Sequence, residues 1–442
     1  MSKSLNVFFV LLFVSSLVYS QKKDEFKPDI KVGGVLFTGW DFNIDDAEFI
    51  SKVDTSQPDA NSIFGYKPAK TQFEKSKNSF FLNRAYLNLF ASLTPDIKAR
   101  VTSDVFSFTD GTGKTQYALL VKFANIYYTP FVCENGLSLG FGLGIISNSW
   151  LSTNEKYWSN RPVAKSFTDY DWTVSVTRNA TTISKTTSSF FSSADLGFEA
   201  ALNLPKGFGE LSFEVLQGNG FRNLSFDTRF KDVMFSAFLH PLANRITKAI
   251  ERAKKNGKDR VLGITDLTLG GFVYMGKLDK SENAATNGVQ YKRNRFGGMA
   301  HFRYNFKKSG FVKIGGEFAT QYNEDPSSSK PDSLIKTNAG GFSSYLELCP
   351  PIESLKEKIS LLFRYDMFDP NTENSSVSIT SFNDNTDKQS LLIAGLVFRP
   401  NKFLGISATY QSITYEKEFI IKYNGTSTKT DGKFFIHSFI NF

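Results

Sequence analysis

The sequence predicts an all-β fold, a transmembrane up-and-down antiparallel β-barrel of about 16 strands behind a cleaved signal peptide. Three observations predict it. Apolar and polar side chains alternate with period two in many short stretches, and the connections between these stretches are by turns short and long. The sequence also ends on a strand-like run, Lys433 to Phe442, whose last residue is aromatic. Outer-membrane barrels often end in this way, because the last strand has to pair with the first and leave no free edge in lipid.

The first 20 residues have the features of a signal peptide. Met1 to Lys3 is short and basic, Leu5 to Val18 is apolar, and Ser20 completes a small-residue cleavage site. A membrane-spanning helix needs roughly 20 apolar residues, and this stretch is shorter. We therefore expect residues 21–442 to form one barrel domain in a bacterial outer membrane, in contact with lipid and lipopolysaccharide.

Composition fits this expectation. Aromatic residues make up 15% of the chain, yet the mean hydropathy of −0.24 is that of a water-soluble protein. A barrel reconciles the two values, since its outer face is apolar and aromatic while its inner face, turns and loops are polar. No linker or low-complexity stretch divides the chain.

The strands expected from period-two alternation end at turn residues. In chain order they span residues 29–42, 79–93, 96–108, 117–130, 136–147, 194–204, 209–218, 230–240, 262–276, 292–306, 309–322, 337–348, 357–368, 388–400, 403–416 and 432–442. Short and long connections alternate between them, which places tight turns at the periplasmic end and long loops outside.

Two connections stand out. The longest, residues 148–193, either folds into the lumen as a constriction or caps the barrel from outside, and the sequence leaves both open. Its candidate constriction residues are aromatic or basic: Trp150, Lys156, Trp158, Arg161, Lys165, Trp172 and Arg178. Residues 241–260 are basic and helix-prone where a short turn is expected, which indicates a solvated helix at the rim or a helix that binds a membrane surface or a partner.

The formal charge of +9 comes from 52 basic and 43 acidic residues. Such an excess can indicate nucleic acid, an anionic membrane surface or a path for anions, or it can simply belong to a solvated surface; the exported address argues against nucleic acid. Strand parity gives these candidates for a pore lining that binds anions: Arg84, Lys98, Arg100, Lys122, Arg293, Arg295, His301, Arg303, Lys313 and Arg364. Each could instead brace the wall beside an acid, as Arg84 could with Asp104. Arg293, Arg295, His301 and Arg303 share one face and could together bind a phosphate or a carboxylate.

Signals for other chemistry are weak. The sequence has three histidines and no Gly-x-Ser-x-Gly, CxxC, HExxH or P-loop motif. We expect no enzyme, no metal and no cofactor. Cys133 and Cys349 fall in separate turns, and we expect two free thiols.

Two segments resemble a known family. Phe81-Leu-Asn-Arg-Ala-Tyr-Leu87 with Arg100-Val-Thr-Ser-Asp-Val105, and Ser193-Ala-Asp-Leu-Gly197 with Gln217-Gly-Asn-Gly220, are similar to hairpins of outer-membrane porins of the phosphate-selective porin O and P type, especially those of Bacteroidetes. The resemblance implies a 16-stranded diffusion channel that is often a homotrimer. It implies phosphate as solute less directly, because acids interrupt any ladder of basic residues: Asp104, Glu199, Glu214, Glu317 and Asp366.

The sequence thus predicts a porin that passes small hydrophilic solutes, mildly favours anions and includes phosphate among its candidate solutes. The alternative is a non-conducting barrel that acts in adhesion or ligand binding through its long loops. A soluble extracellular β-protein with glycan acceptors such as Asn223 and Asn424 is a third hypothesis, but it does not explain the alternation of short and long connections.

Overall fold

The computed structural model describes residues 26–69, 78–109, 115–222, 230–257, 260–279, 290–326, 334–372, 388–422 and 424–442. The expected signal peptide, residues 1–20, lies outside them, and so does Asn223. Among the described residues, no helix is long and apolar enough to cross a membrane.

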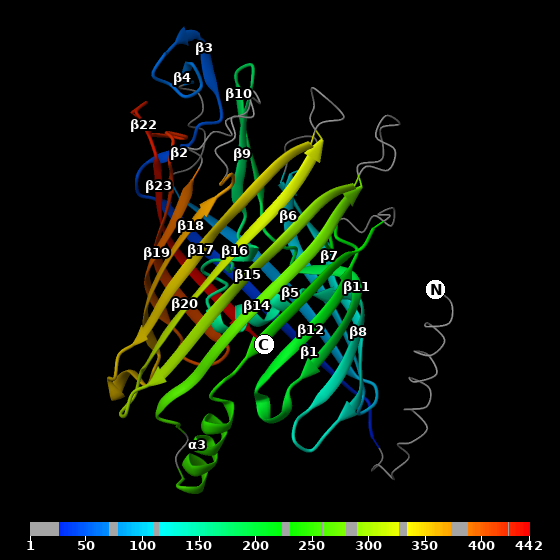
Figure 1. Ribbon diagram of the computed structural model, residues 1–442. Coiled ribbons are helices and arrows are strands. Elements are labelled where there is room, and N and C mark those ends of the chain that lie inside the picture. Colours follow the sequence, from blue (N-terminus) through cyan, green and yellow to red (C-terminus); the bar gives the residue numbers. More distant parts are fainter. Residues whose placement is uncertain are drawn as a thin grey trace.

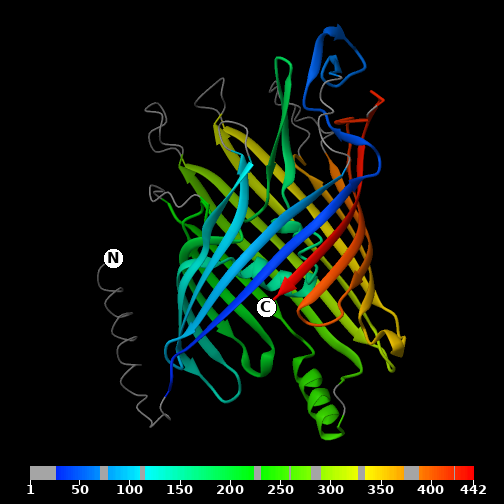
Figure 2. The same ribbon diagram turned by 180° about the vertical axis from the view of Figure 1, so that it is seen from behind.

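Sixteen strands form one closed antiparallel barrel (Figures 1 and 2). Each strand pairs with the barrel strands that precede and follow it in the chain. The first and the last close it, with Leu36 opposite Ile440. All 16 predicted strands are confirmed, with small differences at their ends. They are β1 (Asp29–Asn43), β5 (Asn78–Ser92), β6 (Ile97–Thr109), β7 (Thr115–Val132), β8 (Ser138–Ser147), β11 (Ala194–Asn203), β12 (Gly209–Leu216), β13 (Asp232–Leu239), β14 (Gly263–Asp279), β15 (Gln290–Asn305), β16 (Phe311–Pro326), β17 (Leu334–Cys349), β18 (Ile359–Asp369), β19 (Gln389–Phe398), β20 (Leu404–Tyr415) and β23 (Thr430–Asn441).

Alternation along the strands separates an apolar outer face from the lumen. On β18, Leu361 and Phe363 are 53% and 47% exposed on the outside, whereas Leu362 and Arg364 point inward and are buried. Successive side chains of a strand point to opposite faces, so one slip in register would exchange the two sets. The outer surface is therefore of the kind that hydrocarbon requires.

The two ends of the barrel differ. At one end the connections are short, and two of them contain single turns of 3₁₀ helix, η3 (Pro205–Gly207) and η5 (Glu353–Leu355). The helix expected within residues 241–260 is present as α3 (Ala243–Lys255) and projects from this end (Figure 1). Its basic residues are exposed, while Ile246 and Ala249 are half-buried.

At the other end, three loops join in a compact external cap. It contains β2 (Ala47–Phe49), β3 (Val53–Pro58), β4 (Tyr66–Pro68), β21 (Ile420–Lys422), β22 (Ser427–Thr428) and the hairpin of β9 (Trp172–Asn179) and β10 (Thr182–Ser188). Apolar residues from all three loops form its core, among them Ile50, Val176 and Phe419. The backbone N–H of Ile183 donates to the carbonyl of Ser51 at 2.8 Å, which ties the hairpin to the first loop.

The sequence left open whether the loop of residues 148–193 folds into the lumen or caps the barrel from outside. In the structure, one part of the loop does each. Its first part contains α2 (Ser149–Trp158) and η2 (Phe167–Asp169), which lie inside the barrel (Figure 2). Its second part emerges as the β9–β10 hairpin of the cap. The largest apolar core lies between the inserted part and the inner wall from β8 to β19.

The two cysteines are free thiols, as expected, with Cys349 buried at the end of β17 and Cys133 half-buried after β7. They do not cross-link the barrel.

Candidate functional site

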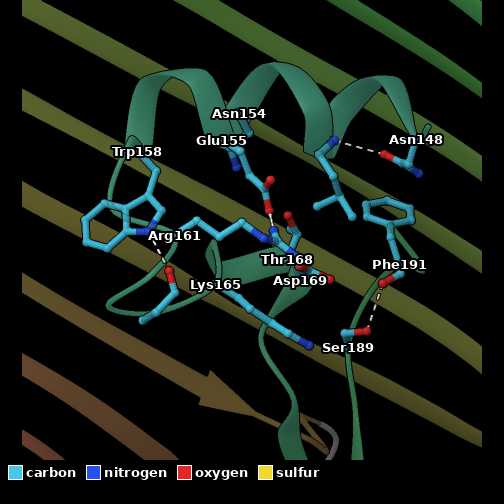
Figure 3. Close-up of polar contacts among 12 residues, drawn as sticks. Asn148, Asn154, Glu155, Trp158, Arg161, Lys165, Thr168, Asp169, Ser189 and Phe191 are labelled. Carbon is cyan, nitrogen blue, oxygen red and sulfur yellow. Dashed lines mark hydrogen bonds and ion pairs between the residues drawn. The ribbon is translucent and has the colours of Figure 1, made fainter. Parts of the chain in front are cut away.

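Helix α2 begins and ends at residues suited to those positions. The side chain of Asn148 accepts a hydrogen bond from the backbone N–H of Leu151 at 2.9 Å and so caps the helix N-terminus (Figure 3). Ser159 ends the helix in a left-handed conformation, with φ at 53°. The short helix is amphipathic enough to bury Trp150 and Trp158 against the barrel wall.

The tryptophans of the loop hold it in place. The Trp150 ring lies 5.2 Å from that of Phe238 and 4.6 Å from that of Phe272. Trp172 stacks on Phe368 at 5.3 Å. Trp150, Trp158 and Trp172 are at most 2% exposed. Their rings therefore pack against the wall, and the expectation that they belong to a constriction stays a prediction.

Acidic residues of the wall also bind the loop. Glu214 accepts the backbone N–H of Ser149 at 2.7 Å. Glu317 accepts the backbone N–H of Phe167 at 2.6 Å and the hydroxyl of Thr168 at 3.2 Å. A buried carboxylate is stabilised by such donors, and the donors would otherwise lack partners. Glu214 and Glu317 therefore anchor the loop. By sequence they interrupt a ladder of basic residues, whereas in the structure their carboxyl groups accept hydrogen bonds from the loop.

Several predicted lining residues prove to be anchors as well. Arg364 is 1% exposed, forms an ion pair with Asp366 at 2.6 Å and donates to the carbonyl of Lys165 at 2.7 Å. Lys313 binds Glu347 at 3.0 Å and the hydroxyl of Ser159 at 3.0 Å. Both side chains brace the loop and the wall.

A charged cluster forms where the loop faces the opposite wall. On the wall, Arg84 binds Asp104 at 2.7 Å, and both Arg84 and Lys122 donate to the hydroxyl of Tyr86, at 2.8 and 2.9 Å. We call Arg84, Tyr86, Asp104, Lys122, Glu155, Arg161 and Asp169 the charged cluster.

On the loop side of the charged cluster, Arg161 forms ion pairs with Glu155 and with Asp169, the latter at 2.9 Å (Figure 3). Lys122 lies within electrostatic range of Arg161 and Asp169, so the two halves of the cluster act on each other. Burial raises the pKa of the phenol of Tyr157, on the same helix as Glu155, from 10.0 to about 12.

The four residues expected to bind one anion do not converge. They share one face of β15, but Arg293 and Arg303 are ten positions apart, which is roughly 33 Å along a strand. Arg293 and Arg295 line a cavity on the outer side of the loop. His301 instead donates to or accepts from the hydroxyl of Tyr345 at 2.9 Å, and Arg303 lies 4.2 Å from the ring of Phe311.

The remaining predicted residues are dispersed. Arg100 lies 4.0 Å from the ring of Phe123, and Lys98 is exposed near the start of β6. Lys156 is exposed on α2, while Lys165 pairs with Asp171 at 2.8 Å. Arg178 belongs to the external cap and donates to the carbonyl of Phe64 at 2.7 Å, so it lies outside the lumen.

Sequence reasoning missed Glu155 and Asp169 of the charged cluster, and also Arg222, which lines the same cavity as Arg293 and Arg295. The first two sit in a loop without periodicity, where nothing marks an inward direction. Among the described residues, no group of three or more His, Cys, Asp or Glu side chains could hold a metal ion. His437 faces the lumen between Phe81 and Phe435, whereas its neighbour Ser438 bonds to Thr38 on the outer face.

Comparison with known proteins identifies the type of fold. No protein-family model and no curated protein matches the chain. Among solved structures, it is similar to an anion-selective porin from Comamonas acidovorans, with 10% identity, a TM-score of 0.51, and coverage of 94% of this chain and 100% of that one. It is also similar to OmpF of Salmonella typhi in complex with daunomycin, with 9% identity, a TM-score of 0.50, and coverage of 93% and 97%. The chain therefore has the 16-stranded fold of outer-membrane porins.

Proposed function

We propose that the protein is a porin of the bacterial outer membrane, a water-filled channel for the passive diffusion of small hydrophilic solutes with a mild preference for anions. Barrels of about 16 strands are wide enough to leave an aqueous channel unless something fills them. Here a loop fills part of the lumen, and the charged cluster lies between this loop and the wall of β5 to β7. We infer that the charged cluster is the constriction of the channel. The proposal involves no catalytic step and no cofactor.

Unpaired arginines carry the proposed preference for anions. Within the charged cluster, Arg84, Lys122 and Arg161 are balanced by Asp104, Glu155 and Asp169. Five arginines of the lumen form no ion pair with any described residue, namely Arg100, Arg222, Arg293, Arg295 and Arg303. Acids such as Asp195, Glu199 and Asp232 also form no ion pair with any described residue, so the proposal requires that the arginines outweigh them along the path. Fixed positive charge there raises the local concentration of anions and lowers that of cations.

The preference for anions is tested by the zero-current potential in a gradient of potassium chloride across a planar bilayer. We expect a potential with the sign of chloride permeation, which moves toward zero in the triple variant Arg293→Gln, Arg295→Gln and Arg303→Gln. Arg245→Gln on α3 removes the same charge outside the barrel and serves as the control. Unchanged selectivity in the triple variant would refute the assignment. Replacing chloride by phosphate in the same experiment tests phosphate, the solute suggested by the resemblance.

The outer face is proposed to contact lipid and lipopolysaccharide, and it is apolar enough to serve as the interface of a homotrimer as well. Large apolar side chains cover it, including Leu143, Phe296 and Phe318 at 67%, 55% and 50% exposure. Chemical cross-linking in native membranes tests the trimer, which should give a single ladder that ends at three chains.

One observation favours the second candidate, a non-conducting barrel for adhesion or ligand binding. The external cap joins three loops in an apolar core of its own, which is more structure than a passive channel needs. A correctly folded, reconstituted protein without conductance would support this candidate over the porin.

A further inference from the structure

The largest apolar core fixes the inserted loop to one side of the lumen. Its wall residues come from β8 to β19, and among the described residues none of β20, β23, β1 or β5 belongs to it. These four strands are neighbours where the barrel closes, at the blue and red strands in the front of Figure 2. In the channel proposed above, solutes therefore pass along the inner face of these four strands.

Phenylalanine side chains follow this inner face from one end of the barrel toward the other. One of them is 43% exposed and the other three are half-buried, so each retains surface that faces the lumen. By strand register they lie at levels between Asp41 and Lys31 of β1, ten positions or roughly 33 Å apart along the strand. We call them the aromatic track, and from the external end they are Phe435, Phe81, Phe439 and Phe90, the last being the most exposed.

Glycines on the neighbouring strands let two of these rings lie flat against the wall. The ring of Phe81 covers Gly39 of β1, where a Cβ atom would collide with it. The ring of Phe439 covers Gly405 of β20 in the same way. Because Gly39 has no side chain, Phe81 also reaches across β1 to the ring of Phe435, 6.3 Å away. The rings of β5 and β23 thus form one apolar surface on a face that is polar in most outer-membrane barrels.

Polar groups border the aromatic track on the side of β5. In the register, Phe37 lies opposite Phe439 on β23 and opposite Arg84 of the charged cluster on β5. The charged cluster contains three basic and three acidic side chains, so it offers hydrogen-bond donors and acceptors without a net charge. A hydroxyl group can use both kinds of partner, because it donates and accepts. An anion would gain from the basic side chains and lose to the acidic ones.

A solute that fits both surfaces has an apolar face and a rim of hydroxyl groups. Sugar rings have this form, since the C–H groups of a pyranose lie on its faces and the hydroxyl groups lie around its edge. Contact with such a face removes apolar ring surface of the track from water, which is favourable. Sugar units also repeat along an oligosaccharide, so successive units can contact successive levels of the track.

We propose that the aromatic track and the charged cluster form a binding path for neutral oligosaccharides, in which sugar rings stack on Phe81 and Phe439 while their hydroxyl groups bond to the charged cluster. The proposal rests on the channel proposed above and names a class of its solutes. It is independent of the preference for simple anions, which the unpaired arginines carry.

The experiment uses maltotriose as the probe, with the purified mature protein in planar bilayers. We expect maltotriose to lower the single-channel current in a saturable manner. Sorbitol at the same concentration of hexose units carries hydroxyl groups but no ring, and it should show no saturable block. The double variant Phe81→Leu and Phe439→Leu keeps apolar bulk but removes two flat faces, so the half-blocking concentration should rise roughly tenfold or more.

Phe434→Leu is the matched control, because it removes a ring from the outer face of β23 and should leave the block by maltotriose unchanged. Phe90→Leu changes the most exposed ring of the track and serves as the second variant if the double variant does not fold. It should raise the half-blocking concentration roughly threefold.

Equal block by sorbitol and maltotriose, or an unchanged affinity in the folded variants of the track, would overturn the proposal while the current in potassium chloride still showed the channel. Titration calorimetry of the detergent-solubilised protein with maltotriose separates the two claims. Binding that these variants weaken, in a protein that does not conduct, would refute the channel and keep the track. Conductance without saturable binding would refute the track and keep the channel.

Discussion

Replacing Glu317 by alanine removes the carboxylate that holds the inserted loop from β16. Glu317 accepts hydrogen bonds from the backbone N–H of Phe167, the hydroxyl of Thr168 and the side-chain amide of Asn154. Hydrogen bonds to a charged group contribute roughly 1.5 to 3 kcal/mol each. Because water entering the space would replace part of them, we expect a loss of about 4 kcal/mol in the free energy of opening the loop locally.

A loss of about 4 kcal/mol raises the population of the opened loop roughly a thousandfold. Hydrogen exchange measured by mass spectrometry on a peptide covering residues 160–172 would detect it, because the amide of Phe167 loses its acceptor. Glu324→Ala is the matched control. Glu324 lies on the same strand and accepts from the backbone N–H of Lys292, which is not part of the loop. Equal exchange of residues 160–172 in the native protein and in Glu317→Ala would refute the anchoring role.

Three further predictions follow from the loop and the thiols. Trp172→Ala should destabilise the aromatic cluster with Phe368 by about 3 to 5 kcal/mol, seen as a lower thermal midpoint for the tryptophan fluorescence of the loop; Trp40→Ala on the outer face should leave that midpoint nearly unchanged, and an equal drop would count against the cluster. Burial raises the pKa of Tyr157 from 10.0 to about 12, so the buried form favours the neutral phenol. The contribution of Tyr157 to the stability of the loop should be fully present below pH 10 and be lost as the pH rises from about 10 to 12. Phenolate absorbance that appears at pH 10 for all tyrosines together would contradict this. Mass spectrometry after alkylation should find both Cys133 and Cys349 modified, and a linked pair would refute the barrel register that separates them.

The barrel itself could be predicted from the sequence for a physical reason. Strands that face lipid on one side and water on the other must alternate in polarity, so apolar and polar residues alternate visibly in the sequence. The alternation fails at Leu362 on β18, which is apolar like its neighbours Leu361 and Phe363 and yet faces inward. That inward residue packs against the inserted loop, whose presence the sequence left undecided.

The site was less predictable, because its contacts join residues that are far apart in sequence. Glu317 and Phe167 are 150 positions apart, and nothing in either segment indicates the other. Period-two parity gives the direction of a side chain correctly but not its level along the barrel. Arg295 and His301 therefore appeared as one site although they lie on different sides of the loop. The short strands of the external cap carry no alternation that would mark them.

Single-channel recording of the purified mature protein in planar bilayers tests the central claim most directly. The account predicts stepwise conductance increments that are ohmic at low voltage and larger in Glu317→Ala, whose loop is less firmly held in the lumen. Folded, inserted protein that produces no increments, with or without the Glu317 anchor, would contradict a water-filled path through this barrel.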